Sequence, residues 1–167
     1  MSHLPPRAAR RFSPAPVDAG DLRRMLEAGR WTGSARNRQP WRFAVVEDAA
    51  LRRALSRLGA YAQHLAGAPL VVALAVDESS GADSHFDAGR AAQSIMSAAG
   101  ALGYGSCPAT LFPEVNVDRA GVLLGLAAPW RVRWALAVGR PAPGPAGGGR
   151  RAIPEGRRPL DELVVRP

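Results

Sequence analysis

The run from Ala68 to Val76 constrains the fold more than any other part of the chain, because it is apolar at every position. A strand with one solvated face alternates apolar and polar residues, whereas a strand covered on both faces reads as a continuous apolar run. The sequence therefore predicts a strand inside the molecule, with other parts of the chain packed against both of its faces.

Helical and strand patterns alternate along the rest of the chain. Asp18 can cap a helix that runs to about Arg30 and carries Leu22, Met25, Leu26 and Gly29 on one face. The further elements expected are a strand over 41–47, a helical stretch over 51–65 that weakens near Gly59, a helix over 86–102, a short helix over 115–126 and a strand over 130–138. This alternation predicts an α+β or α/β fold, and we expect a single domain over 1–167.

Neither end of the chain has a helical pattern. Residues 1–16 contain four prolines, which forbid a helix, so we expect an extended arm. Residues 141–156 are rich in proline and glycine and predict a flexible loop. A short tail with several apolar residues occupies 157–167.

The formal net charge is +8, yet the composition argues against a nucleic-acid partner. All 22 basic residues are arginine, and acidic residues are dispersed among them, so that no basic stripe forms. No apolar run approaches the roughly 18 residues that span a bilayer, and the N-terminus lacks the apolar stretch of a signal peptide. With a single cysteine and no internal disulfide, we expect a cytoplasmic protein without a membrane partner.

Residues 34–43 join the first predicted helix to the first predicted strand and combine small side chains with two amides. Small side chains let a ligand approach the backbone, and Asn37 and Gln39 each offer a donor and an acceptor. Such amides can read the edge of a heteroaromatic ring. By themselves these residues are equally consistent with an ordinary polar loop.

This segment is one of a set that follows a recognisable order. The others are residues 7–12 on the arm, 87–93 at the start of the long helix, 103–110 after it, 138–141, and 157–163. Together they resemble the nitroreductase family of flavin enzymes over nearly the whole chain, from about residue 7 to residue 165. No single motif carries the resemblance, which rests on order and spacing.

The resemblance implies an α+β, three-layer fold, with a mixed central sheet flanked by helices, in an intertwined homodimer. The small residues of the 86–102 helix suit close contact between two subunits, although their composition equally allows a helix buried against a sheet. The resemblance also implies FMN, bound between the two subunits, with NADH or NADPH as the electron donor.

Cations from both ends of the chain are implied as the phosphate site, namely Arg7, Arg10, and either Arg157 or Arg158. Guanidinium groups bind phosphate through paired hydrogen bonds and keep their charge. The family's arm reads Arg-Arg-Ser-x-Arg, whereas here Ala8 stands in place of the serine and the first arginine is missing. We therefore expect a weaker hold on the phosphate, or compensation by Arg11 or the C-terminal pair.

The flavin ring and its sugar-alcohol chain are assigned by the resemblance to Ser34, Asn37 and Gln39 of the neighbouring subunit. Gly33 stands where the family usually has proline, which keeps the turn but loosens it. Trp41 is expected in the core rather than stacked on a ligand.

The reactive face of the ring is assigned to the segment around Pro108, Ala109 and Thr110, whose free backbone amides can stabilise negative charge on the reduced ring. Cys107 has no base nearby in the sequence and is not expected to be a nucleophile. The histidines lack metal-ligand spacing, so no catalytic side chain and no metal site are assigned.

The resemblance thus implies an FMN-dependent oxidoreductase that passes hydride from NAD(P)H to a nitroaromatic, a quinone or a similar small-molecule acceptor. Two alternatives stay open. One is a flavin-dependent dehydrogenase or oxidase of a small heterocycle or peptide. The other is a flavin-binding module with little turnover, which the altered arm favours.

Overall fold

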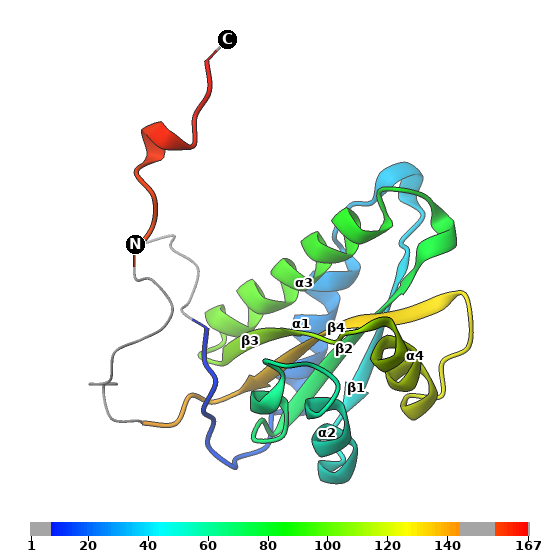
Figure 1. Ribbon diagram of the computed structural model, residues 1–167. Coiled ribbons are helices and arrows are strands. Elements are labelled where there is room, and N and C mark those ends of the chain that lie inside the picture. The colour runs from blue at the N-terminus through cyan, green and yellow to red at the C-terminus, as the bar shows by residue number, and fades with distance from the viewer. Residues whose placement is uncertain (1–7, 144–155, 167) are drawn as a thin grey trace.

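The computed structural model describes residues 8–143 and 156–166 (Figure 1). Within them, a four-stranded sheet is covered by helices on both faces. Most of the segment expected to be a Pro/Gly-rich loop lies outside the described residues, as does the beginning of the arm.

The sheet consists of β1 (Trp41–Val46), β2 (Leu70–Asp77), β3 (Gly105–Thr110) and β4 (Trp130–Gly139), in the spatial order β1-β2-β4-β3. Each neighbouring pair is antiparallel. The mixed sheet implied by the resemblance is therefore wrong for the described residues, because no strand among them has a parallel neighbour.

The central position of β2 explains its apolar run. Every residue of the strand except Asp77 is buried. Leu70, Val72 and Leu74 belong to the core on one face, while Val71 and its alternate neighbours belong to the core on the other. A period of two sends successive side chains to opposite faces, so both sets must be apolar when both faces are covered.

One face of the sheet is covered by α1 (Ala19–Arg30) and α3 (Ser84–Ala101), which lie side by side (Figure 1). Asp18 caps α1 as predicted, since its side chain accepts a hydrogen bond of 2.9 Å from the Asp21 N–H. Gly29 lets the two helices approach closely, because a Cβ there would lie 2.8 Å from Cγ1 of Ile95.

The other face carries α2 (Ala49–Ser56) and α4 (Glu114–Leu123). The predicted helical stretch over 51–65 is interrupted near Gly59, as expected, and resumes only as the short 3-10 turn η2 (Gln63–Leu65). The α+β class and the three-layer arrangement are confirmed.

The sequence did not predict β3, which contains a glycine and a proline, two residues that are depleted in strands. Pairing with β4 overrides that preference. Proline is tolerated because β3 is an edge strand and Pro108 directs its missing donor position away from β4.

Candidate functional site

The N-terminal arm lies along the outer edge of β3. The N–H of Ala9 donates to the carbonyl of Ser106 at 3.0 Å, and the N–H of Ser13 donates to the carbonyl of Arg140 at 2.9 Å. These bonds place the exposed Ala8 and Arg10 beside the edge strand. Arg7 lies outside the described residues.

A cleft of about 320 Å³ opens between this arm, β3 and the η2 region. Its walls are Arg10, Tyr61, Gln63, His64, Pro108, Ala109, Thr110 and Phe112. The structure therefore brings together the arm arginine and the 108–110 segment that the sequence assigned to one cofactor. Tyr61, Gln63 and His64 were missed, because their segment was interpreted only as the weak end of a helix.

The alternation of β3 decides which backbone amides face this cleft. The N–H of Leu111 donates to the carbonyl of Arg133 at 2.7 Å, so odd-numbered residues here bond to β4. Ala109 accordingly directs its N–H into the sheet, and Thr110 directs its own to the outer edge. Of the two amides expected to face a ligand, Thr110 supplies the available donor.

Gly59 fixes the position of this edge. A Cβ at residue 59 would overlap the carbonyl oxygen of Thr110, and the neighbouring Leu58 carbonyl accepts a 2.9 Å bond from the Phe112 N–H. The close approach that glycine permits therefore holds the end of β3 against the turn after α2.

The second predicted cluster sits on the loop before β1. Ser34 Oγ accepts a hydrogen bond of 2.8 Å from the Gln39 N–H, and Gln39 Nε2 donates to Asn37 Oδ1 at 3.1 Å. Both amide side chains are exposed, while Ser34 is half-buried.

This loop is strained and anchored. Arg36, Asn37 and Gln39 have left-handed φ angles of 52°, 53° and 50°. Such an angle costs a residue such as arginine or glutamine about 1–2 kcal/mol, and asparagine less. The N–H of Ala35 donates to the buried Asp87 at 2.8 Å, which ties the loop to the first turns of α3. Strain held in place by such contacts is typical of ligand-binding segments.

Within one copy the two clusters do not meet. The Ser34 loop leads into β1 and the cleft borders β3, and these strands form opposite edges of the sheet. Neighbouring strands lie about 4.8 Å apart, so the edges are separated by about 14 Å. The loop borders its own hollow of about 430 Å³, whose walls include Ser34, Phe86 and Arg90.

The C-terminal arginines are also apart from the cleft. Arg157 and Arg158 are exposed, and Arg157 donates to the carbonyl of its neighbour Gly156 at 2.8 Å. The tail that carries them lies away from the sheet in Figure 1. A single copy thus leaves Arg10 without the second arginine expected from the other terminus.

Burial governs the titratable groups beside the cleft. It raises the pKa of the Cys107 thiol, although Arg10 opposes the effect, so the thiol stays protonated and is a poor nucleophile. Burial and then the charge of Arg10 lower the pKa of His64, although its hydrogen bond to the Cys107 carbonyl opposes them. Trp41 is buried in the core, as predicted.

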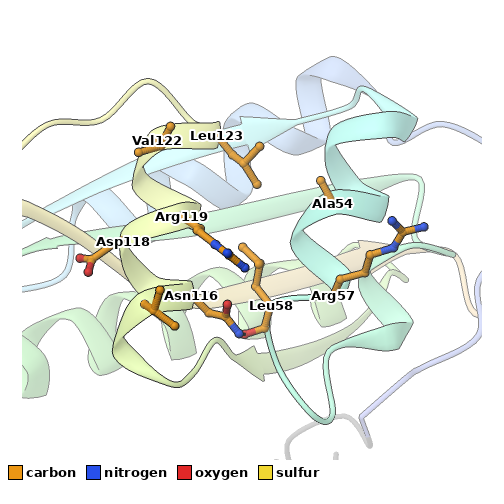
Figure 2. Close-up of a pocket in the computed structure, with 9 residues that line it drawn as sticks. Ala54, Arg57, Leu58, Asn116, Asp118, Arg119, Val122 and Leu123 are labelled. Atoms are coloured by element: carbon orange, nitrogen blue, oxygen red, sulfur yellow. The ribbon is translucent and has the colours of Figure 1, made fainter.

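A larger hollow of about 590 Å³ lies between α2 and α4 (Figure 2). Its walls include Leu58, Val122 and Leu123, and the side chain of Arg119 extends from α4 toward Leu58, whereas Arg57 points away from the hollow. None of the predicted site residues borders it, and we assign no ligand to it.

Among the residues that the structure describes, no three His, Cys, Asp or Glu side chains gather in a way that could hold a metal ion. No helix in this part of the chain is both long and apolar enough to cross a membrane.

The sequence model of the nitroreductase family matches residues 7–59 and 56–140. The chain belongs to the nitroreductase family. This confirms the predicted resemblance and, with it, the class of oxidoreductases. The match covers the arm, the Ser34 loop, the Asp87 helix and β3, which are the segments that form both clusters.

Individual nitroreductase relatives extend the likeness. An NADH dehydrogenase of Thermus thermophilus is 44% identical over 71 residues, which are 42% of this chain and 35% of that protein. A Desulfovibrio desulfuricans protein solved in complex with FMN has 29% identity and a TM-score of 0.76, over 96% of this chain and 91% of its own. An FMN-dependent nitroreductase of Clostridium difficile shares the fold at 23% identity, with a TM-score of 0.78 over 83% and 84% of the two chains.

Proposed function

We propose that this nitroreductase-family protein is an FMN-dependent oxidoreductase that takes hydride from NADH or NADPH and passes electrons to a nitroaromatic, a quinone or a similar acceptor. The observation that carries the proposal is the cleft at the β3 edge, where Arg10 and the outward N–H of Thr110 border one cavity. The names of the Thermus and Clostridium relatives support the donor and the cofactor, respectively.

The residues of the cleft fit FMN. A flavin needs a cation for its phosphate, polar groups for its edge and apolar surface for its face. Arg10 supplies the cation, Gln63 an amide, and Pro108 and Phe112 apolar surface. The side chain of Gln63 is partly fixed already, because its Nε2 donates to the Ala60 carbonyl at 2.8 Å and leaves Oε1 available.

When bound, FMN would supply the hydride chemistry. The task of the protein is then to bind, orient and stabilise charge. The Thr110 N–H is a fixed donor on a rigid strand, and such donors stabilise developing negative charge without reorganisation. No side-chain acid is required of the chain, since solvent can deliver protons to the acceptor.

We further propose that two copies assemble, so that Ser34, Asn37 and Gln39 of one subunit face the β3 cleft of the other. The support is the separation of the two clusters on opposite sheet edges. On the exposed side of α3, Gly89 has open space where a side chain would stand. A partner helix can approach closely there, and Arg157 or Arg158 of one tail could then reach the other subunit's site.

The experiment is to purify the protein, record its visible spectrum and add FMN to any colourless preparation. The expected result is a flavin spectrum that bleaches on anaerobic addition of NADH or NADPH and returns with a nitroaromatic or quinone. Failure to bind FMN would contradict the proposal. Bound flavin that stays oxidised with both nicotinamides would instead favour a binding module with little turnover.

A further inference from the structure

His64 borders the cleft without a part in the function proposed above. It lies in η2, half-buried, with Nε2 3.3 Å from the carbonyl oxygen of Cys107 on β3. Arg10 borders the same cleft from the arm. The cleft therefore has a permanent cation on one element and an ionisable imidazole on another.

The surroundings of His64 both oppose and favour its protonation. Burial comes first among the causes that lower its pKa, and Arg10 adds repulsion of the protonated ring. The carbonyl of Cys107 and the backbone of Tyr61 favour the protonated ring. In the described part of the chain, the titratable or charged groups that border the cleft with His64 are Arg10 from the arm and Tyr61 from its own turn. The Cys107 thiol on β3 is buried and also lies within the influence of Arg10.

We propose that Arg10 and His64 form an anion-accepting subsite in which occupation by an anion drives His64 to take up a proton. The inference rests on the proposed flavin site. A negative charge beside Arg10 cancels its repulsion of the imidazolium and attracts the ring directly. The acceptor carbonyl of Cys107 is already in place for the protonated form, so no rearrangement of β3 is needed.

The same coupling acts in reverse. If the anion promotes protonation of His64, protonation of His64 must tighten anion binding by the same factor. Two parts of one cofactor carry such a charge, namely the phosphate of FMN and the reduced flavin ring. The shared chemistry is an anion held between a guanidinium and an imidazole, and a comparison of FMN with riboflavin separates the two sources.

The first test follows the His64 ring by NMR in the flavin-free protein, with His64→Gln used to assign its signal. The pH titration is repeated with FMN, with riboflavin and with riboflavin reduced by dithionite. The expected result is a His64 titration displaced to higher pH by FMN or by reduced riboflavin, and left in place by oxidised riboflavin, which carries no negative charge. Displacement by FMN alone would identify the phosphate as the anion that His64 senses. Displacement by reduced riboflavin would identify the reduced flavin ring.

The second test measures FMN affinity by fluorescence quenching between about pH 5.5 and 8, the range in which histidines titrate. We expect the affinity ratio of wild type to His64→Gln to rise by about fivefold or more on acidification, within the usual range of coupling factors. Because the phosphate of FMN titrates in the same way with both proteins, its effect drops out of this affinity ratio. His85→Gln is the matched control, because His85 lies near Glu78 in another part of the chain, and it should leave the pH dependence unchanged.

Arg10→Gln provides the complementary variant, since its exposed side chain can be replaced without loss of the fold. It should raise the pH at which His64 titrates in the flavin-free protein and reduce the further displacement by the ligand. The inference is overturned if FMN binds while the His64 titration stays the same with every ligand. If FMN does not bind at all, the proposed function fails together with it.

Discussion

The hydroxyl of Tyr104 donates a 3.0 Å hydrogen bond to Oδ2 of Asp21, across 83 positions of sequence. The hydroxyl oxygen of Tyr104 accepts a 3.3 Å hydrogen bond from the N–H of Asp18, and the guanidinium of Arg140 lies 4.4 Å from the centroid of the Tyr104 ring. Tyr104 therefore connects the first turn of α1 to the end of α3 and to β4. This contact fixes the entry to β3, from which the proposed flavin cleft is built.

Tyr104→Phe should destabilise the fold by about 1–3 kcal/mol, because it removes two partly buried hydrogen bonds and leaves the ring in place. Urea unfolding followed by circular dichroism measures the difference. Tyr61→Phe is the matched control, since Tyr61 is 83% exposed and its hydroxyl contributes little to folding. Equal stability of the two variants would show that the Asp21 contact is not needed.

Gly59→Ala should destabilise the protein by about 1–3 kcal/mol through overpacking against the Thr110 carbonyl. Because this contact positions the edge of β3, we also expect weaker FMN binding. Gly67→Ala is the control, as nothing lies within 4 Å of a Cβ at that position. Unfolding curves and flavin titration of both variants provide the comparison. If Gly59→Ala is destabilised but binds FMN as tightly as wild type, the contact between Gly59 and Thr110 is not needed for the FMN site.

Ser34→Ala should weaken FMN binding by about 3- to 10-fold, the value of one hydrogen bond, with little change in melting temperature. The hydroxyl accepts the Gln39 N–H and so holds a loop with three left-handed residues. Ser79→Ala removes a comparable hydroxyl bonded to Asp77 and should leave binding intact. Flavin fluorescence gives both affinities. An unchanged FMN affinity for Ser34→Ala would show that this loop is not part of the cofactor site.

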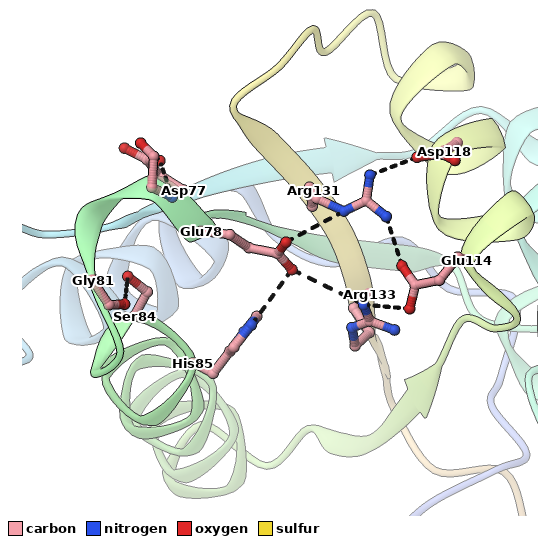
Figure 3. Close-up of polar contacts among 10 residues, drawn as sticks. Asp77, Glu78, Gly81, Ser84, His85, Glu114, Asp118, Arg131 and Arg133 are labelled. Carbon is pink, nitrogen blue, oxygen red and sulfur yellow. Dashed lines mark hydrogen bonds and ion pairs between the residues drawn. The ribbon is translucent and has the colours of Figure 1, made fainter.

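The ion-pair network in Figure 3 predicts an acid-sensitive contribution to stability. Glu114 Oε1 lies 2.7 Å from Arg133 and its Oε2 lies 2.6 Å from Arg131, and hydrogen bonds to these arginines lower its pKa below the usual 4.5. The pKa of Glu114 is therefore lower in the folded protein than in the unfolded chain. The stabilisation that follows is fully present at a pH above the unfolded-state pKa, and it is lost as the pH falls through the folded-state pKa.

Glu114→Gln should therefore have a lower melting temperature than wild type at neutral pH. The difference in melting temperature should become smaller as the pH falls below 4.5. The difference will be small, because exposed pairs contribute little. Thermal unfolding across this range measures it. Glu162→Gln on the exposed tail is the control and should show no such narrowing. A pH-independent difference would mean that Glu114 acts through packing rather than charge.

Gly89→Leu tests the proposed assembly. The position is exposed in one copy and has open space around it, so a larger side chain fits a lone subunit and clashes only with a partner. Leucine also favours the helix more than glycine does, by up to about 1 kcal/mol. We expect light scattering to report a dimer for wild type and for Ala50→Leu on α2, and a monomer for Gly89→Leu. A wild-type monomer would contradict the two-copy site.

Local pattern was sufficient where one physical signal dominated. The Asp18 cap, the β2 run and the break near Gly59 could each be predicted, because capping, two-sided burial and glycine flexibility act over a few residues. β3 could not be predicted, since its composition opposes a strand and only β4 makes it one.

The same distinction between local pattern and tertiary structure applies to the candidate site. The chain alone determined which residue types are present: the arm arginines, the Asn37 and Gln39 amides, and a segment without bulky side chains before Thr110. Only the tertiary structure decided that Arg10 and Thr110 border one cleft, that His64 joins them, and that Ser34 lies at the opposite edge of the sheet. Propensity and periodicity act between neighbours in sequence, whereas the pairing of strands distant in sequence sets which side chains share a cavity.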